Sequence, residues 1–231
     1  MKTICVVQHT EAEYLGLIED HFEGRNIRFT YKRPFTSGGT LPTSTDGFDG
    51  LFLLGGGPYG LVSGHLLPSL GHELRLTRAF LEAGLPVVGF ELGAVILATA
   101  AGGGASEAPL RFEVGPVTAT RPGLLGGMLP DHFPMAAYLR DRPALPAGAD
   151  VFATAASGEP MIFGIGSNCL GFVGHPGAKH GMMEDLIMEF AETPDDTAAS
   201  LHLLGQAQSG IANALTSLMV GVAGFTGLME E

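Results

Sequence analysis

Tryptophan is absent from this sequence, cysteine occurs twice, and basic residues are scarce. Two cysteines, Cys5 and Cys169, are too few for the disulfide framework of a small secreted protein. The 12 Lys and Arg residues stand against 24 Asp and Glu residues, which gives a formal net charge of −12. An acidic chain without basic clusters repels phosphate backbones, so we expect no nucleic-acid partner. Because no His, Cys, Asp or Glu group has a metal-like spacing and no motif indicates a cofactor, we predict neither.

The amino terminus also lacks the long apolar region of a secretory signal peptide, because its first apolar stretch is only Ile4–Gln8. We therefore predict a cytoplasmic protein. The 231 residues are enough to bury one substantial hydrophobic core.

Short apolar stretches alternate with segments of helical periodicity in the first half of the chain. We expect strands at Ile4–Gln8, Ile27–Tyr31, Gly50–Leu54 and Leu85–Phe90, and helices at Glu11–Glu23 and His72–Ala83. This alternation predicts an α/β fold, a flavodoxin-like, doubly wound and mostly parallel sheet. From Phe112 onward, short strands separated by turns predict a small antiparallel excursion, followed by a helix over residues 181–192.

The last part of the chain has a different pattern. Apolar residues recur every three or four positions from Leu201 to Met229, with one polar interruption at Gln208, and this is typical of a heptad seam. We therefore divide the chain into an α/β domain at residues 1–192 and an apolar C-terminal helix within 193–231. The seam predicts packing against the domain itself or a homo-oligomer. Several glycines and the absence of basic or Trp anchors argue against a membrane span.

The segment Gly89–Gly93 predicts a sharp strand-to-helix turn of the nucleophile-elbow type. An apolar β-branched run precedes it, a run of helix formers follows it, and glycines flank its central residue. Such a turn projects one side chain beyond the carboxyl edge of the sheet, next to a backbone N–H that can bind an anion. A covalent hydrolase would carry Ser or Cys at this position, but here the residue is Glu91.

The order of these motifs resembles the class I glutamine amidotransferases, the triad glutaminase domains that pass ammonia to a synthase. The motifs that carry the resemblance are Gly55–Pro58, the elbow, Gly102-Gly103, Phe112–Gly115, Leu145–Ala149 and His175-Pro176. The similarity covers residues 1–192, and it implies the fold of that family and a synthase-type protein partner.

Residue by residue, the resemblance places the family's cysteine nucleophile at Glu91 and its catalytic histidine at His175. The acid that orients the histidine maps to Gly177, and a substrate-holding glutamine maps to Val95. The oxyanion hole is retained in outline by the backbone of Gly56, Gly57 and Leu92. Because three side chains that the mechanism needs are missing, we predict a protein that is inactive as a glutaminase.

Three interpretations of Glu91 stay open. It pairs with His175 as a structural link, or it grips a small polar ligand together with His175, or it acts as nucleophile or general base on an amide or γ-glutamyl-type substrate. In each case we expect the carboxylate to crowd the oxyanion hole. Three functions stay open with them. They are a ligand- or partner-binding pseudoenzyme, an enzyme of changed chemistry that uses Glu91, and a structural subunit that oligomerises through its C-terminal helix.

Overall fold

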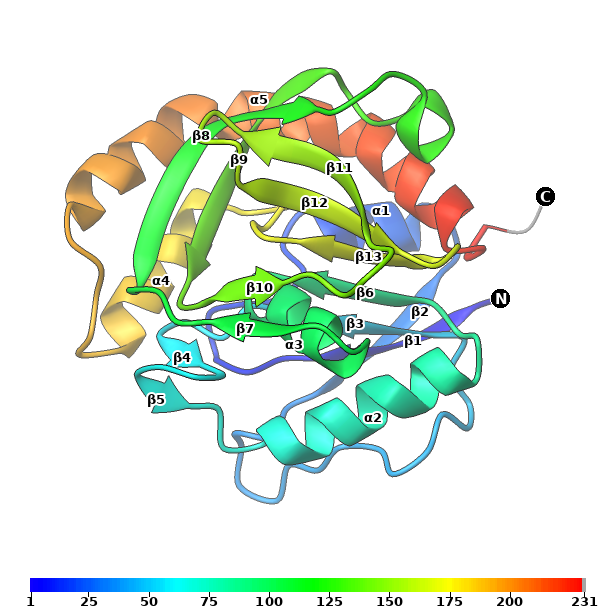
Figure 1. Cartoon of the computed structure of the whole chain (residues 1–231). Coiled ribbons are helices and arrows are strands. Elements are labelled where there is room, and N and C mark those ends of the chain that lie inside the picture. The colour runs from blue at the N-terminus through cyan, green and yellow to red at the C-terminus, as the bar shows by residue number, and fades with distance from the viewer. Residues whose placement is uncertain (230–231) are drawn as a thin grey trace.

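The computed structural model describes residues 1–229, and its centre is a nine-stranded mixed sheet (Figure 1). The last two residues of the predicted C-terminal segment 193–231 lie outside the described residues. Across the sheet the strands follow the order β2 (Arg28–Lys32), β1 (Thr3–Val7), β3 (Gly50–Leu53), β6 (Val87–Phe90), β13 (Cys169–Phe172), β12 (Pro160–Ile165), β11 (Asp150–Ala155), β8 (Arg111–Ala119) and β9 (His132–Leu139). Two small sheets pair β10 (Arg142–Ala144) with β7 (Gly104–Ser106), and β4 (Tyr59–Gly60) with β5 (His65–Leu66).

The first five strands of this order, from β2 to β13, are parallel to one another. When these five are counted along the chain their order is 2-1-3-4-5, the strand order of flavodoxin-like sheets. Ligands of such sheets bind beyond the carboxyl ends of the strands, at the switch point between the first and third. This strand order therefore predicts a site at the carboxyl ends of β1, β3 and β6.

The antiparallel part is larger than the small excursion that the sequence predicts. β12, β11, β8 and β9 continue the same sheet in antiparallel pairing, and β8 and β9 are its two longest strands. The expectation of a mostly parallel sheet with a small excursion is wrong in this respect. Pro116 and Gly115 interrupt the apolar pattern of β8, and the run Met135–Leu139 is buried throughout, so neither strand shows the alternation of a half-exposed strand.

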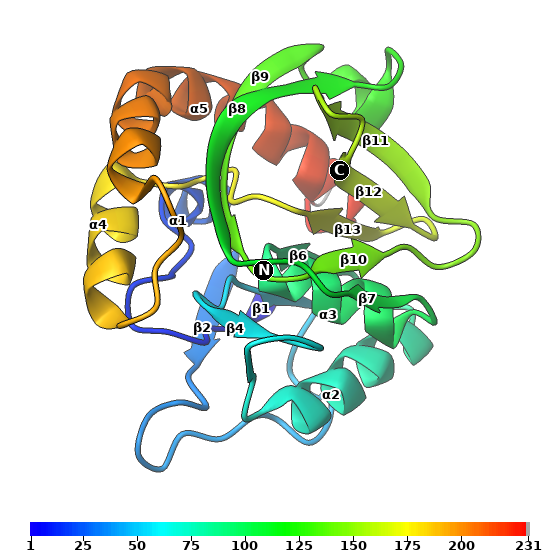
Figure 2. The same ribbon diagram turned by 60° about the vertical axis from the view of Figure 1, so that its left-hand side comes forward.

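Helices cover both faces of the sheet (Figure 2). One face carries α2 (Leu70–Glu82) and α3 (Leu92–Ala100), which contact each other, and the other carries α1 (Ile18–Glu23), α4 (His180–Glu189) and α5 (Thr197–Phe225). A 3₁₀ turn, η1 (Leu124–Gly127), packs against α5. The two-sided cover explains why β1, β3, β6 and β13 are buried almost throughout.

The segment between β1 and α1 differs from its prediction in a way that matters for the site. The periodicity of Tyr14, Leu15, Leu17, Ile18 and Phe22 predicts a helix from Glu11, but the helix begins at Ile18. Gly16 has φ +65°, and its neighbour Leu17 donates a backbone hydrogen bond to the Gly177 carbonyl at 3.0 Å. Residues 8–17 are therefore a loop that lies across the end of the sheet.

Helix α5 packs on its own domain. Its seam residues Leu204, Ile211, Leu215, Leu218 and Val222 are buried, and the helix contacts β8, β9, η1 and α4. The seam that suggested a homo-oligomer is thus covered by the chain's own core, and the pattern needs no second subunit. Within residues 1–229, no helix is long and apolar enough to cross a membrane.

Candidate functional site at the strand-to-helix elbow

The turn between β6 and α3 is a strained elbow with Glu91 at its tip. Glu91 has φ 52° and ψ −114°, a conformation that a residue with a side chain adopts only where surrounding contacts enforce it. A Cβ at Gly89 would overlap the backbone of Gly93, and a Cβ at Gly93 would overlap the Leu53 carbonyl. Both flanking glycines are therefore required by close backbone approach, as the sequence motif predicts.

The Glu91 side chain is fully buried, with 0% of its surface exposed. Its Oε1 accepts a hydrogen bond of 2.7 Å from the backbone N–H of Tyr138, on β9. Its Oε2 faces a second buried carboxyl group, that of Glu13 in the loop between β1 and α1: a Cβ at Gly55 would overlap both Glu91 Oε2 and Glu13 Oε1. The side chain at the tip of the elbow therefore lies in the interior, next to the carboxyl group of Glu13.

Glu13 is held in place from its other side. Its Oε2 accepts a hydrogen bond of 2.5 Å from Gly57 N–H, and its own N–H donates to Thr10 Oγ1 at 3.1 Å. The carboxyl group of Glu13 thus takes one of the backbone donors that the resemblance assigns to the oxyanion hole.

Two carboxylates cannot both be charged at this distance in a buried site, so the pair holds a proton. Burial raises the pKa of Glu13 to about 7, against the lowering effect of its hydrogen bonds with Glu91 and Gly57. Burial and the charge of Glu13 raise the pKa of Glu91 well above its ordinary value. The facing oxygens, Glu13 Oε1 and Glu91 Oε2, are buried and have no other hydrogen-bond partner among the described residues. We infer a protonated Glu91 that donates to Glu13, whose charge is stabilised by Gly57 N–H.

The predicted pairing of Glu91 with His175 is wrong. His175 is fully buried, its Nε2 lies 2.9 Å from the Tyr14 carbonyl, and its Nδ1 accepts from Gly177 N–H at 3.1 Å. Burial lowers the pKa of this imidazole to about 4, so the ring is neutral, with the proton on Nε2. Its face stacks on Phe90 with ring centroids 5.4 Å apart. Both nitrogens are engaged by backbone groups, and neither is directed at the elbow carboxyl.

An acid cannot take the place of Gly177 without rearrangement. A Cβ at this position would come within 2.9 Å of Ile18 Cγ1 and 3.1 Å of the Leu15 carbonyl. The loop between β1 and α1 therefore occupies the space that an orienting acid would need. Val95, which replaces the substrate-holding glutamine of the family, is fully buried in the core.

Gly56 and Leu92, which the resemblance assigns to an oxyanion hole, contact each other, but Glu91 does not bind the backbone donors of that assignment. A Cβ at Gly56 would overlap the Leu92 side chain, so Gly56 and Leu92 are in direct contact. The N–H of Gly57 is bonded to Glu13, and Glu91 accepts from Tyr138 instead. The carboxylate that would compete with an oxyanion for the Gly57 N–H is therefore that of Glu13, and the sequence analysis did not identify it.

Access to the elbow is closed in this structure. Glu91 and His175 are 0% exposed and Leu92 is 1% exposed, so no substrate can touch any of them without a movement of the loops above. One of these loops follows Gly57 and is fastened by Asp141, which accepts from the N–H groups of Leu61 at 2.8 Å and Val62 at 2.9 Å.

A second polar network lies next to the first, and sequence reasoning missed it as well. His9 Nε2 is 2.7 Å from Glu73 Oε2, His9 Nδ1 is 2.8 Å from the Gly55 carbonyl, and Ser69 Oγ donates to Glu73 Oε1 at 2.5 Å. The signal that could have found His9 is its position directly after the first predicted strand, at the carboxyl edge of the sheet. Glu13 lies inside the helix predicted for Glu11–Glu23, so the sequence offered no such signal for it. In residues 1–229 no group of three or more His, Cys, Asp or Glu side chains is placed to hold a metal ion.

Comparison with known proteins agrees with the fold. No protein-family model matches the sequence, and no curated protein matches it. Among solved structures, the chain is similar to a glutamine amidotransferase from Thermotoga maritima, with a TM-score of 0.81 and 22% identity over 97% of this chain and 98% of that one. A glutamine amidotransferase from Methylobacillus flagellatus gives a TM-score of 0.82 and 19% identity over 100% and 96% of the two chains.

A more distant similarity links the chain to a protein from Thermoplasma acidophilum that is assigned as a GMP synthase subunit. That match has a TM-score of 0.58 and 17% identity, and it covers 90% of this chain and 98% of that one. Each match extends over nearly the whole chain, with α5 included in the longest. The chain therefore has the fold of the glutamine amidotransferases, from β1 through its C-terminal helix.

Proposed function

We propose that this protein is an amidotransferase-like subunit that does not hydrolyse glutamine and acts by binding, with a synthase-type protein as its partner. The observation that carries the proposal is the buried acid pair at the elbow. A nucleophile must touch its substrate, and Glu91 instead shares a proton with Glu13 under closed loops. The general base is missing too, because His175 engages both ring nitrogens with backbone groups.

The proposal of a partner protein rests on two observations. One is the similarity to a chain assigned as a GMP synthase subunit. The other is the pair of exposed apolar side chains Val62 and Leu66, 51% and 56% exposed, on the segment that follows the Gly55–Gly57 loop. Large apolar side chains exposed on one short segment are compatible with an interaction surface.

An assay of ammonia release from glutamine tests the proposal. We expect no release above the buffer rate from the protein alone or with a synthase that lacks its own glutaminase, while a cysteine-bearing amidotransferase of this fold serves as positive control. Glu91→Cys should also remain inactive, because Gly177 and Val95 do not supply the acid and the amide. Turnover of glutamine by the unmodified protein would overturn the proposal.

The alternative function is an enzyme of changed chemistry, and one observation favours it. Two carboxyl groups that share a proton, one of them on a strained turn, form an acid–base pair of the kind that catalytic sites use. If the loops open, Glu91 and Glu13 could act on an amide, an ester or a γ-glutamyl compound. A substrate panel measured with the unmodified protein and with Glu91→Gln separates the two functions, because an activity that depends on Glu91 supports the alternative alone.

A further inference from the structure

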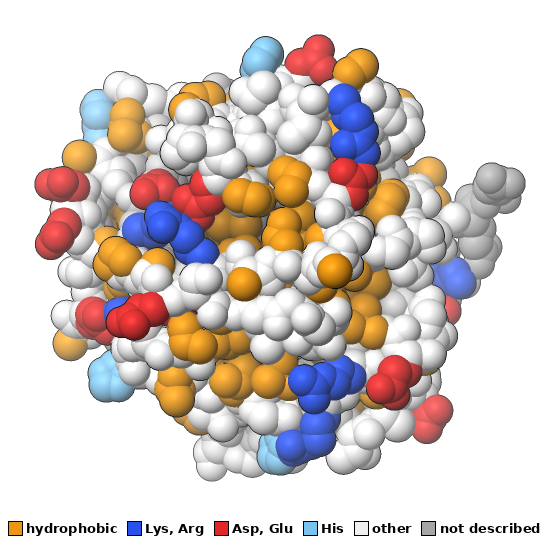
Figure 3. Space-filling model, in the orientation of Figure 1, with side chains coloured by type: hydrophobic (Ala, Val, Ile, Leu, Met, Phe, Trp, Pro, Cys, Tyr) orange, Lys and Arg blue, Asp and Glu red, His pale blue; other side chains and the backbone are white. Residues whose placement is uncertain are grey.

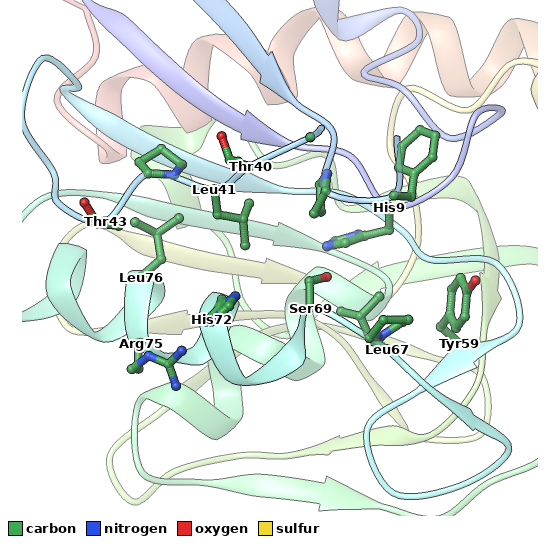
Figure 4. A pocket seen from close by; sticks show the side chains of 15 residues that line it. His9, Thr40, Leu41, Thr43, Tyr59, Leu67, Ser69, His72, Arg75 and Leu76 are labelled. Atoms are coloured by element: carbon green, nitrogen blue, oxygen red, sulfur yellow. The ribbon is translucent and has the colours of Figure 1, made fainter. Parts of the chain in front are cut away.

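An opening toward the carboxyl ends of β1 and β3 lies beside His9, away from the elbow. A cavity of about 710 Å³ lies there, between the loop that follows β2, the segment that precedes α2, and the first turns of α2 (Figure 4). Its volume is within the range of small-molecule sites. His9 follows β1 and Tyr59 follows β3, so the cavity lies at the switch point where flavodoxin-like sheets bind ligands.

The walls of this cavity are apolar for the most part. Leu41, Leu67, Leu76 and Tyr59 lie around it, and Phe35, at its edge, is 38% exposed. Figure 4 shows Leu41 and Leu76 on one side of His9 and Leu67 and Tyr59 on the other. Walls of this kind match a flat apolar or aromatic body.

The charge of the cavity is opposite to that of the whole chain. None of its described lining residues is Asp or Glu, although the chain carries a net charge of −12. Arg75 and His72 lie on the exposed side of α2 at the cavity, and basic side chains gather over α2 on the molecular surface (Figure 3). In the part of the chain that the structure describes, the guanidinium of Arg75 and the hydroxyls of Thr40 and Thr43 have no protein partner.

The floor of the cavity is a fixed polar group. His9 is 2% exposed, and its two nitrogens face the Gly55 carbonyl and the Glu73 carboxylate, both of which accept. Burial lowers the pKa of His9, but the charge and the hydrogen bond of Glu73 outweigh burial and raise it. Because both nitrogens face acceptors, the geometry favours an imidazolium, with its charge balanced from behind by Glu73 and its ring lining the cavity.

We propose that this cavity binds a small planar organic anion, an aromatic carboxylate in size and charge, with its rings against Leu41, Leu76 and His9 and its carboxylate at Arg75. A single unpaired guanidinium favours a monoanion. The inference deepens the proposed binding role but does not depend on the inactivity of the elbow, which the ammonia assay tests separately.

Titration of the full chain with 2-naphthoate, followed by NMR of backbone amides and Leu methyl groups, tests the proposal. We expect saturable shifts at His9, Leu41, Ser69 and Leu76. The neutral 2-naphthamide should bind about three- to fivefold more weakly, the range of one exposed charge contact. Shifts centred in another groove, or equal affinity for the acid and the amide, would overturn the proposal, and so would no binding at millimolar 2-naphthoate.

Two variants on the same helix make the test specific. Arg75→Gln should remove the preference for the acid over the amide, whereas Arg78→Gln, an exposed arginine one turn nearer the end of α2, should leave it unchanged. Leu41→Trp, which fills the cavity from the loop after β2, should abolish binding of both probes. If Arg78→Gln lowers the affinity as much as Arg75→Gln does, the preference reflects the general charge of α2 and the assignment of the carboxylate to Arg75 is wrong.

Discussion

At the scale of single residues, the ionisation of Glu91 decides what the elbow can do. A charged carboxylate at this buried position would lie beside Glu13 with only the Tyr138 N–H to stabilise it. Sharing a proton with Glu13 removes that cost. The elbow retains its strained backbone and its two glycines, so the shape of a catalytic turn persists around a side chain that forms part of the core.

The acid pair makes stability depend on pH. Because the pKa of each acid is raised on folding, its contribution is fully present below the ordinary glutamate value of 4.5. The contribution of Glu13 is lost as the pH rises through about 7, and that of Glu91 is lost as the pH rises through its own raised pKa. We therefore expect Glu91→Gln, which mimics the protonated acid, to raise the free energy of unfolding at pH 8 by ~1–3 kcal/mol and to change little at pH 5.

Urea denaturation at the two pH values measures this effect, with Glu113→Gln as the control, because the Glu113 side chain is 64% exposed. A Glu91→Gln variant that is less stable than the unmodified protein at pH 8 would contradict the shared proton. His175 acts in the opposite direction, since its pKa is lowered to about 4 and its contribution is lost as the pH falls from 6.5 toward 4. The comparison at pH 5 and 8 is between variants, so the His175 effect cancels.

At the scale of elements, the loops decide whether the elbow is accessible. Asp141 holds the loop after Gly57 through N–H groups of three consecutive residues and the Ser63 hydroxyl. Asp141 itself has φ 61°, so its backbone is adapted to this contact. The clamp couples the end of β9 to the segment that carries β4.

Removal of this clamp should free the loop before it unfolds the domain. We expect Asp141→Ala to lower the free energy of unfolding by ~2–4 kcal/mol, since several hydrogen bonds to a charged group are lost together. Amide hydrogen exchange at Leu61 and Val62 should accelerate more than exchange in β3. Asp131→Ala, at an exposed position, is the control. Unchanged exchange at Leu61 and Val62 would show that the loop is held by other contacts.

The elements and the site differ in how far the sequence predicts them. Apolar runs locate β1, β3, β6, β12 and β13 because these strands are short and mostly buried. The sequence also locates β2 and β11, which are less buried. The apolar spacing before α1 also fits a longer helix. The features that prevent it, the positive φ of Gly16 and the hydrogen bond of Leu17 to Gly177, depend on the folded structure and cannot be seen in the sequence. The elbow is recognisable from its glycines. The partner of Glu91 is not, because Glu13 is 78 positions away (91 − 13) and only the folded loop brings it there.

At the scale of the whole molecule, α5 is part of one hydrophobic core with the sheet. Leu215, Leu218 and Val222 belong to the same buried cluster as the strands, whereas Leu203 on the same helix is 46% exposed. The heptad spacing therefore serves an intramolecular contact, and small residues allow close approach: a Cβ at Gly221 would come within 2.8 Å of Leu125 Cβ.

Two leucines on this helix provide a matched test. We expect Leu218→Ala to lower the free energy of unfolding by ~2–4 kcal/mol, the cost of a cavity in a packed core, and Leu203→Ala to change it by less than ~0.5 kcal/mol. Thermal unfolding and sedimentation of both variants would measure the effect. A change in oligomeric state with Leu218→Ala, without loss of stability of the single chain, would instead assign the seam to contacts between subunits.

The acid at the elbow is, on this reasoning, a buried, proton-sharing group and not an exposed nucleophile. The most direct measurement is the titration of the Glu13 and Glu91 carboxyl ¹³C resonances by NMR, assigned with the Glu91→Gln variant. We predict that neither carboxyl group is ionised at pH 6, that the proton of Glu13 is lost near pH 7, and that Glu91 keeps its proton when Glu13 ionises. If both carboxyl groups are fully ionised by pH 5.5, Glu91 is a free carboxylate and the shared proton is contradicted.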